Sequence, residues 1–247
     1  MRKALVAGNW KMNGSLSALQ HFIAALELNP SVDTVLFPPA VFLSAAVEQA
    51  PVALGCGVQD VGTAMQGAHT GEISATMVRE LGGRWSIVGH SERRHDQYES
   101  DEMVAAKAAA ALKGGLRPLV CVGETLAERQ AGSEQQVVQR QLDIVLAQVD
   151  DVALRDVVVG YEPVWAIGTG ESASALQVQA MHGFIRSVVR ARDSQAAEAM
   201  CIIYGGSVNA DNARELFAQA DVDGALVGGA SLDAEAFSAI IAAAAGP

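Results

Sequence analysis

A single carboxylate, Glu162, stands between an apolar run and a glycine-rich segment in the stretch GYEPVWAIGTG, residues 160–170. Pro163 restricts the backbone just after it, which holds the side chain on a rigid stem. Such a carboxylate can act as a general base, while Gly168 and Gly170 permit the chain beyond it to move over a ligand. An ordinary acidic loop residue beside a turn would fit this stretch equally well.

Three other polar side chains have types suited to the same chemistry. Asn9 and Lys11 are two residues apart, so an extended chain would turn both toward one side. His90 ends the run WSIVGH and precedes SERR, a plausible helix start, where the helix dipole opposes protonation of the imidazole. A solvated strand end is the alternative interpretation of Lys11, because an isolated lysine is mostly exposed.

Two glycine-rich turns near the C-terminus could bind a phosphate. YGGSV (204–208) and ALVGGASL (225–232) each precede a helix-like segment, so they would present free amide groups at a helix start. The candidate residues are Ser207, Gly228 and Gly229. One Gly-Gly pair alone often marks only a turn. Two such loops in succession favour an anion site.

Short apolar or β-branched runs alternate with helix-like segments along the whole chain. The expected strands cover residues 4–10, 34–38, 53–59, 85–90, 117–123, 156–162, 200–206 and 223–229. The expected helices cover residues 17–27, 40–50, 73–82, 101–115, 133–148, 174–192, 209–219 and 233–245. Near-continuous apolar strands are typical of a parallel sheet that helices cover on its faces.

Eight strand–helix units in 247 residues predict an α/β protein with one (β/α)8 barrel domain, residues 1–247. No linker or composition break divides the chain. Active sites of this fold form where strands end, and phosphate sites commonly follow the last two strands. The polar residues described above occupy those positions.

Composition limits the possible partners and compartments. A net charge of −11 argues against a nucleic-acid partner, and no apolar run is long enough for a membrane span. No dinucleotide or P-loop glycine pattern is present. Cys56, Cys121 and Cys201 lie far apart in apolar runs, which favours buried thiols in a reducing compartment. We therefore expect a cytoplasmic protein.

Seven sequence blocks carry a resemblance to a known family. They are AGNWKMNG (7–14), GAHTGE (67–72), GHSERR (89–94), CVGETLAERQAG (121–132), YEPVWAIGTG (161–170), YGGSV (204–208) and ALVGGASL (225–232). In this order and spacing the sequence resembles the triosephosphate isomerase family, whose fold is the TIM barrel. The resemblance implies interconversion of dihydroxyacetone phosphate and D-glyceraldehyde 3-phosphate through an enediolate, a step of glycolysis and gluconeogenesis.

The resemblance also implies a role for each catalytic candidate. Glu162 would be the base that moves the proton, and His90 would be the neutral group that hydrogen-bonds the enediolate. Lys11 and Asn9 would add electrostatic support, and Glu92 matches the acid that partners the lysine.

Phosphate binding and lid closure follow from the same resemblance. Gly168, Ser207 and Gly229 match phosphate-gripping positions, and Gly228 adjoins them. Closure of residues 163–170 would exclude water from the reaction. No metal or organic cofactor is expected, because the carbonyl of the substrate acidifies the hydrogen that moves.

The segment 60–72 is overlong for a simple strand-to-helix connection. In the family that the chain resembles, this loop inserts into a second subunit, which implies a homodimer in which Thr70 supports Asn9 and Lys11 of the neighbour. His69 departs from the aromatic residue, such as Phe, that is frequent there. Cys121 also matches a familiar cysteine of that family, although core packing would explain it equally well.

Two alternative functions stay open. A sugar-phosphate lyase of the same fold would use a Schiff-base lysine within a strand, whereas Lys107 and Lys113 lie in the expected helix 101–115. A catalytically silent barrel is the other alternative.

Overall fold

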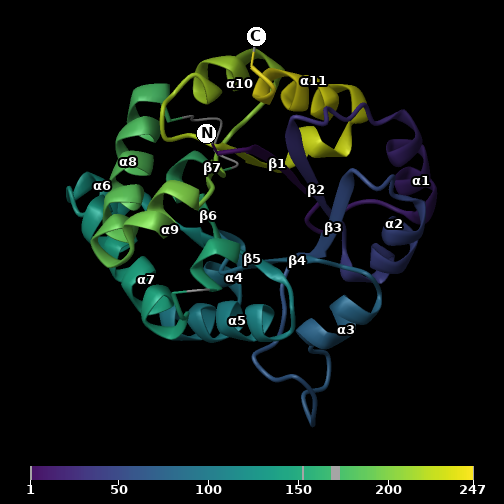
Figure 1. The fold of residues 1–247 in the computed structure, drawn as a ribbon, viewed down its shortest axis with the longest axis horizontal. Helices are drawn as coiled ribbons and strands as arrows, with labels where there is room; N and C mark the ends of the chain where they lie inside the picture. The colour runs from purple at the N-terminus through teal and green to yellow at the C-terminus, as the bar shows by residue number, and fades with distance from the viewer. Residues whose placement is uncertain (1, 152, 168–172, 247) are drawn as a thin grey trace.

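The computed structural model describes residues 2–151, 153–167 and 173–246, so Gly168 and Gly170 lie outside the described residues. Its strands are β1 (Ala4–Asn9), β2 (Val32–Phe37), β3 (Leu54–Val58), β4 (Trp85–Val88), β5 (Arg117–Val122), β6 (Val158–Tyr161), β7 (Ile202–Tyr204) and β8 (Gly224–Val227). Each strand pairs in parallel with the next, and β8 pairs with β1 to close the barrel (Figure 1). The predicted (β/α)8 fold is confirmed.

Both faces of the barrel strands are buried, as the apolar runs predicted. Along β1, Leu5 and Ala7 belong to the cluster inside the barrel, whereas Val6 belongs to the layer between the strands and the helices. The interior cluster also contains aromatic side chains, Phe37 from β2 and Trp85 from β4. This alternation follows from the period of two in a strand.

Helices surround the barrel and cover its outer face (Figure 1). They are α1 (Leu16–Ala25), α2 (Leu43–Gln49), α3 (Ala75–Glu80), α4 (Ser91–Asp96), α5 (Asp101–Lys113), α6 (Leu126–Gln130), α7 (Glu134–Gln148), α8 (Ala175–Arg192), α9 (Ser194–Ala199), α10 (Ala210–Phe217) and α11 (Ala234–Ala244). Short 3-10 helices are η1 (Ala40–Phe42), η2 (Ala153–Asp156), η3 (Val164–Ala166) and η4 (Gly229–Leu232).

Two short helices, α6 and α9, were missing from the sequence-based expectation. Thr125 begins α6 with a capping box that includes Glu128, and Asp193 caps the first amides of α9. Such brief helices owe their ends to local capping, because they are too short to display an apolar period. The plausible helix start at SERR is confirmed as α4.

The strands end earlier than the apolar runs predicted. The expected strand 85–90 is β4 (Trp85–Val88), and the expected strand 200–206 is β7 (Ile202–Tyr204). The apolar runs continue past the last paired residue of each of these strands, so a prediction from apolar composition makes the strands too long. His90 and Glu162 therefore lie just beyond the strands.

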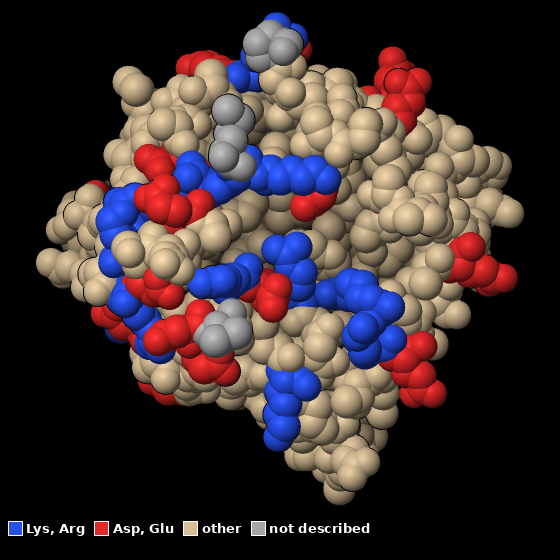
Figure 2. Space-filling model, in the orientation of Figure 1, with Lys and Arg blue, Asp and Glu red and all other residues tan. Residues whose placement is uncertain are grey.

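Figures 1 and 2 view the barrel from the end at which its strands begin. Figure 2 shows Lys and Arg side chains gathered on this face of the molecule. Arg2, Lys3 and Arg117 line a small hollow where the strands begin. Carboxylates bind two of these cations: Arg2 Nε lies 2.6 Å from Asp223 and Lys3 Nζ lies 2.6 Å from Asp33. Of these three cations, Arg2 and Lys3 are therefore paired with carboxylates, and Arg117 lies over the ring of Trp85.

All three cysteines are free thiols. Cys56 and Cys121 are buried as expected, whereas Cys201 is partly exposed at the hollow where the strands begin. No helix within the described ranges has the length and apolar character needed to cross a membrane.

Candidate active site

A cavity of about 380 Å³ opens at the C-terminal ends of the strands. Its walls come from the ends of β1, β4, β6, β7 and β8 and from the loops that follow them. Of the predicted site residues, it brings together Asn9, Lys11, His90, Glu162, Ser207, Gly228 and Gly229. Residues far apart in sequence therefore share one pocket.

Glu162 follows β6 and is 2% exposed. Its Oε2 accepts a hydrogen bond of 2.9 Å from the backbone N–H of Ser91, and its Oε1 lies 3.1 Å from Nε2 of His90. The backbone N–H of Glu162 donates to Val122 O at 2.8 Å, which continues the β5–β6 pairing by one residue. Contacts to its two oxygens thus orient the carboxylate, and a hydrogen bond from its N–H fixes the backbone of Glu162.

The hydrogen bonds of His90 define its tautomer. His90 is the N-cap of α4, and its Nδ1 accepts from the backbone N–H of Glu92 at 3.2 Å. An accepting Nδ1 carries no proton, so the proton is on Nε2, which points at Glu162.

Lys11 reaches the cavity by a different route from the one predicted. β1 ends at Asn9, and Lys11 has a left-handed backbone with φ of 51°, so strand alternation does not place the two side chains. Instead, Asn9 Oδ1 accepts from the Lys11 N–H at 2.9 Å. The Gln59 amide donates to Lys11 O at 2.8 Å and holds this strained turn.

The Lys11 ammonium lies 2.6 Å from Oε1 of Glu92, as predicted. The two side chains are 31% and 49% exposed, and an ion pair at that exposure contributes little free energy. The ammonium can therefore turn from Glu92 toward an anion in the cavity at small cost.

The two glycine-rich loops differ in how much backbone they leave free. Asn209 caps α10 by accepting from the N–H groups of Asp211 and Asn212, so that helix start is already satisfied. After β8, an added Cβ at Gly229 would meet nothing within 4 Å, and η4 rather than an α-helix starts there.

Glu124 is a buried acid that lies two residues past the end of β5. Its side chain is 0% exposed and is not among the residues that line the cavity. It accepts from Trp165 Nε1 at 2.8 Å and Tyr161 Oη at 3.1 Å, and it pairs with Arg129 at 3.1 Å. Burial and the charge of Glu124 raise the pKa of the Tyr161 phenol. The available signal was an acid at a strand end beside a glycine.

Two supporting candidates lie outside the cavity. Cys121 is buried in β5, where burial and the nearby Glu162 carboxylate raise the pKa of its thiol. Thr70 is exposed in the loop between β3 and α3, which projects from the rim of the barrel (Figure 1). A single chain therefore does not bring Thr70 to its own Asn9 and Lys11.

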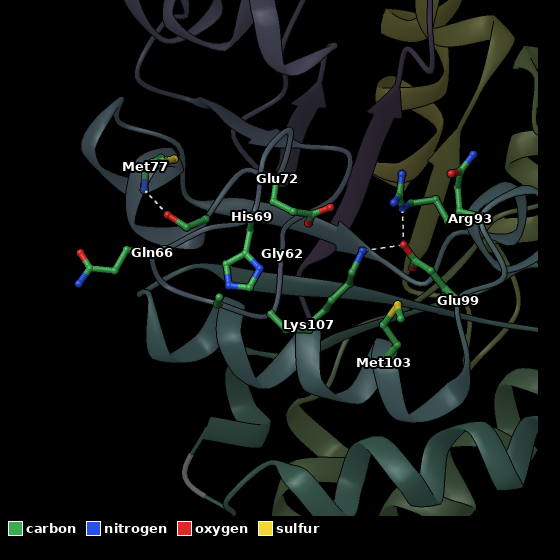
Figure 3. A pocket seen from close by; sticks show the side chains of 14 residues that line it. Gly62, Gln66, His69, Glu72, Met77, Arg93, Glu99, Met103 and Lys107 are labelled. Atoms are coloured by element: carbon green, nitrogen blue, oxygen red, sulfur yellow. Dashed lines mark hydrogen bonds and ion pairs between the residues drawn. The ribbon is translucent and has the colours of Figure 1, made fainter.

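A larger cavity, of about 450 Å³, lies between this loop and α5. Figure 3 shows Lys107 and Arg93 converging on Glu99, at 2.6 Å each, and Lys107 Nζ also lies 2.5 Å from Asp60. Burial raises the pKa of Asp60 to about 6. The charged groups in this cavity therefore form ion pairs with one another. The described part of the chain has no group of three or more His, Cys, Asp or Glu able to hold a metal ion.

Comparison with known proteins agrees with this geometry. The family model for triosephosphate isomerase matches residues 4–244. The chain is 49% identical to a triosephosphate isomerase of Photorhabdus laumondii over 250 residues, which cover 99% of this chain and 98% of that protein. It is 50% identical to the Delftia acidovorans protein of that name, covering 99% and 100%, and 47% identical to that of Xanthomonas euvesicatoria, covering 99% of each. The chain belongs to the triosephosphate isomerase family.

Proposed function

We propose that this protein interconverts dihydroxyacetone phosphate and D-glyceraldehyde 3-phosphate, as an intramolecular aldose–ketose isomerase of glycolysis and gluconeogenesis. Family membership supports the substrate, and the separation of 3.1 Å between Glu162 and His90 in the cavity supports the chemistry. A base and a neutral hydrogen-bond donor side by side suit the removal of a proton next to a carbonyl.

Glu162 is the proposed base. Its carboxylate takes a proton from C1 of the ketose and returns it to C2, while the hydroxyl proton of O1 moves to O2 by way of His90, and the reverse reaction uses the same steps. Nε2–H of His90 donates to the carbonyl oxygen, where negative charge develops in the enediolate. Because the imidazole is uncharged, it can donate a hydrogen bond and receive a proton without starting as a cation.

Lys11 and Asn9 complete the proposed electrostatic environment. The Lys11 ammonium can leave Glu92 and face the enediolate or the phosphate of the substrate, since the pair is exposed. Asn9 is 5% exposed, holds the Lys11 backbone and lines the same cavity. We assign Glu92 the role of keeping the ammonium in reach when no substrate is bound.

The phosphate is proposed to bind at Ser207, Gly228 and Gly229. The open space around Gly229 and the ordinary contact of 3.6 Å that a Cβ at Gly228 would make with Lys11 support this assignment. Gly168, which lies outside the described residues, is proposed as a fourth contact. The reaction calls for no metal or organic cofactor, because the carbonyl itself acidifies the hydrogen that moves.

Residues 163–170 are proposed to close over the substrate and exclude water. The described part of this segment includes η3, and Ala166 and Ile167 line the cavity. The bond from Trp165 to Glu124 ties the start of the segment to the wall of the barrel. Binding of the phosphate would contribute the free energy for closure.

The protein is proposed to be a homodimer of single-domain subunits in the cytoplasm, with no nucleic-acid or membrane partner. Met12 is 96% exposed beside Lys11, and Met77, 52% exposed, lines the cavity of Figure 3. Exposed apolar side chains around a projecting loop favour a protein interface. Thr70 of one subunit is proposed to support Asn9 and Lys11 of its neighbour.

An assay of the purified protein with each triose phosphate in turn tests the proposed function. We expect both directions of turnover. A folded dimer without turnover would favour a silent barrel, and cleavage of a larger sugar phosphate would favour a lyase. The geometry argues against the lyase, because the buried Lys107 is paired with Asp60 and Glu99 outside the candidate active site.

A further inference from the structure

We propose that Gln141, on helix α7, is a positioning residue for the isomerisation: its amide holds the backbone of Gly123, on which Glu162 and the start of the lid segment rest. The inference depends on the proposed function for its catalytic consequence. The contact itself can be tested separately.

One side chain satisfies both polar backbone groups of Gly123. Gln141 Oε1 accepts from the Gly123 N–H at 2.8 Å, and Gln141 Nε2 donates to Gly123 O at 3.2 Å. Gln141 is 5% exposed, on a helix whose other buried residues are Val137, Val138, Leu142, Val145 and Leu146. An amide on an otherwise apolar buried face needs such partners, because an unpaired buried polar group is costly.

The Gln141 side chain supplies hydrogen-bond partners just past the end of strand β5. β5 ends at Val122, so Gly123 lies one residue past the paired strand. Its N–H and C=O take the Gln141 side chain as partner in place of a neighbouring strand. The helix thus fixes the position and the rotation of this peptide.

Gly123 in turn lies directly against the backbone of Glu162. A Cβ at position 123 would lie only 1.8 Å from Glu162 O and 2.6 Å from its carbonyl carbon, so no side chain fits between the two residues. A displacement of Gly123 therefore moves the residue that carries the proposed base.

The residues on either side of Gly123 hold the same segment. Val122 O accepts from the Glu162 N–H at 2.8 Å, and Glu124 O accepts from the Val164 N–H at 3.0 Å. The Glu124 carboxylate accepts from Trp165. Residues 122–124, which we call the seat, therefore hold residues 162–165 in place. The Gln141 side chain, from α7, hydrogen-bonds Gly123, the middle residue of the seat.

Replacement of Gln141 by Met removes both hydrogen bonds and keeps a long unbranched side chain. Because a misplacement of about 1 Å in a catalytic group can cost on the order of 100-fold in rate, we expect kcat to fall by about 10- to 100-fold. KM should change by less than about threefold, because the hydrogen bonds of Gln141 go to Gly123 rather than to the proposed phosphate loops after β7 and β8.

The variant Gln141→Glu provides a conditional rescue. A protonated carboxyl has one donor and one acceptor, as the amide does, whereas an ionised carboxylate has only acceptors and would repel Gly123 O. Burial favours the protonated form. We therefore expect the ratio of variant kcat to wild-type kcat to rise several-fold as the pH falls from about 8 to about 6.

Other charged groups in this region are the same in both proteins, so the ratio removes their effect. On the side of the seat these are Glu162, Glu124 and Arg129. From α5 and α7 they are Asp101 and Arg140, and Arg94 lies between them and β5.

Leu142→Ala is the matched control, because it weakens the next buried position of α7 without touching Gly123. Below its unfolding transition this variant should keep kcat within about twofold of wild type. Any of three results would overturn the proposal. The first is a kcat for Gln141→Met equal to that of the wild type, and the second is an equal loss of kcat in Gln141→Met and Leu142→Ala. The third is a ratio of Gln141→Glu kcat to wild-type kcat that does not change with pH.

Hydrogen exchange of the Gly123 amide tests the contact without any enzyme assay. We expect exchange at least about tenfold faster in Gln141→Met than in the wild type, with Leu142→Ala as the control at matched stability. If the wild type shows no isomerase activity, the proposed function fails, but this measurement still tests whether the Gln141 side chain holds the Gly123 backbone. Unchanged exchange in Gln141→Met would show that the amide does not hold Gly123.

Discussion

The carboxylate of Glu162 and the imidazole of His90 lie 3.1 Å apart, and the first turn of α4 orients both of them. The N–H of Ser91 donates to the carboxylate, and the N–H of Glu92 donates to the imidazole. The free amides at the start of a helix are thereby used to set the geometry of an acid–base pair.

Replacement of Glu162 by Gln should lower kcat by about 10³-fold, because it removes the proton acceptor and keeps the shape of the side chain. The inhibition constant of glycerol phosphate should change little, since the phosphate loops are untouched. Steady-state kinetics with that inhibitor measure both quantities. An unchanged kcat would rule out Glu162 as the base.

Replacement of Thr70 by Arg should separate the proposed dimer, because a long cation at the tip of the projecting loop would not fit a partner surface. Light scattering across a concentration series measures the mass. Val52→Arg, at a fully exposed position, is the control and should leave the mass unchanged. A stable dimer of the Thr70 variant would contradict the proposed docking of the loop.

His182 should make the protein less stable in acid. It is fully buried with its ring edge against Tyr161, and burial lowers its pKa from 6.5 to about 4. The unfolded chain binds the proton more tightly, so stability is lost as the pH falls from about 6.5 toward 4. Between pH 7 and pH 5 the loss should be about 2 kcal/mol.

Urea unfolding of the wild type and His182→Gln at the two pH values isolates this contribution. The difference in unfolding free energy between the two proteins should shrink or change sign at pH 5. Asp60 acts in the opposite direction, because its raised pKa stabilises the folded state as pH falls through about 6, but it is common to both proteins. A pH-independent difference would contradict the assignment.

Two Gly→Ala replacements should have opposite effects on stability. Gly123→Ala would force the Glu162 backbone to move, and we expect a loss of more than about 2 kcal/mol in unfolding free energy. Gly183 lies within α8, where an added Cβ would meet only ordinary contacts, at 3.4 Å and beyond. Gly183→Ala should therefore gain about 0.5 to 1 kcal/mol. Thermal and urea unfolding measure both.

Much of the fold could be predicted because each barrel strand is buried on both faces and reads as a short apolar run. The fold then indicated which ends of those strands would carry the site, and Glu162 and His90 meet there as expected. The position of Lys11 was predicted for the wrong reason, since a left-handed turn rather than an extended strand directs it.

Apart from the pair of Lys11 and Glu92 and the meeting of Glu162 with His90, polar contacts between distant residues could not be predicted. Gln141 and Gly123 are 18 residues apart, and Trp165 and Glu124 are 41 apart, with no local pattern that pairs them. The Ser91 amide has no side-chain signature at all. A glutamine on the apolar face of an amphipathic helix is the one signal available for Gln141.

The order of the strands around the barrel is their order in the chain, so a single seam, between β1 and β8, joins the two ends of the polypeptide. At this seam the Leu5 amide donates to Asp223 O at 2.9 Å, and Arg2 holds the Asp223 carboxylate. Until Gly224 emerges from the ribosome, the nascent protein has two unpaired strand edges, which invite wrong pairing between chains. Once β8 pairs with β7 and β1, neither edge remains open to a strand of another chain.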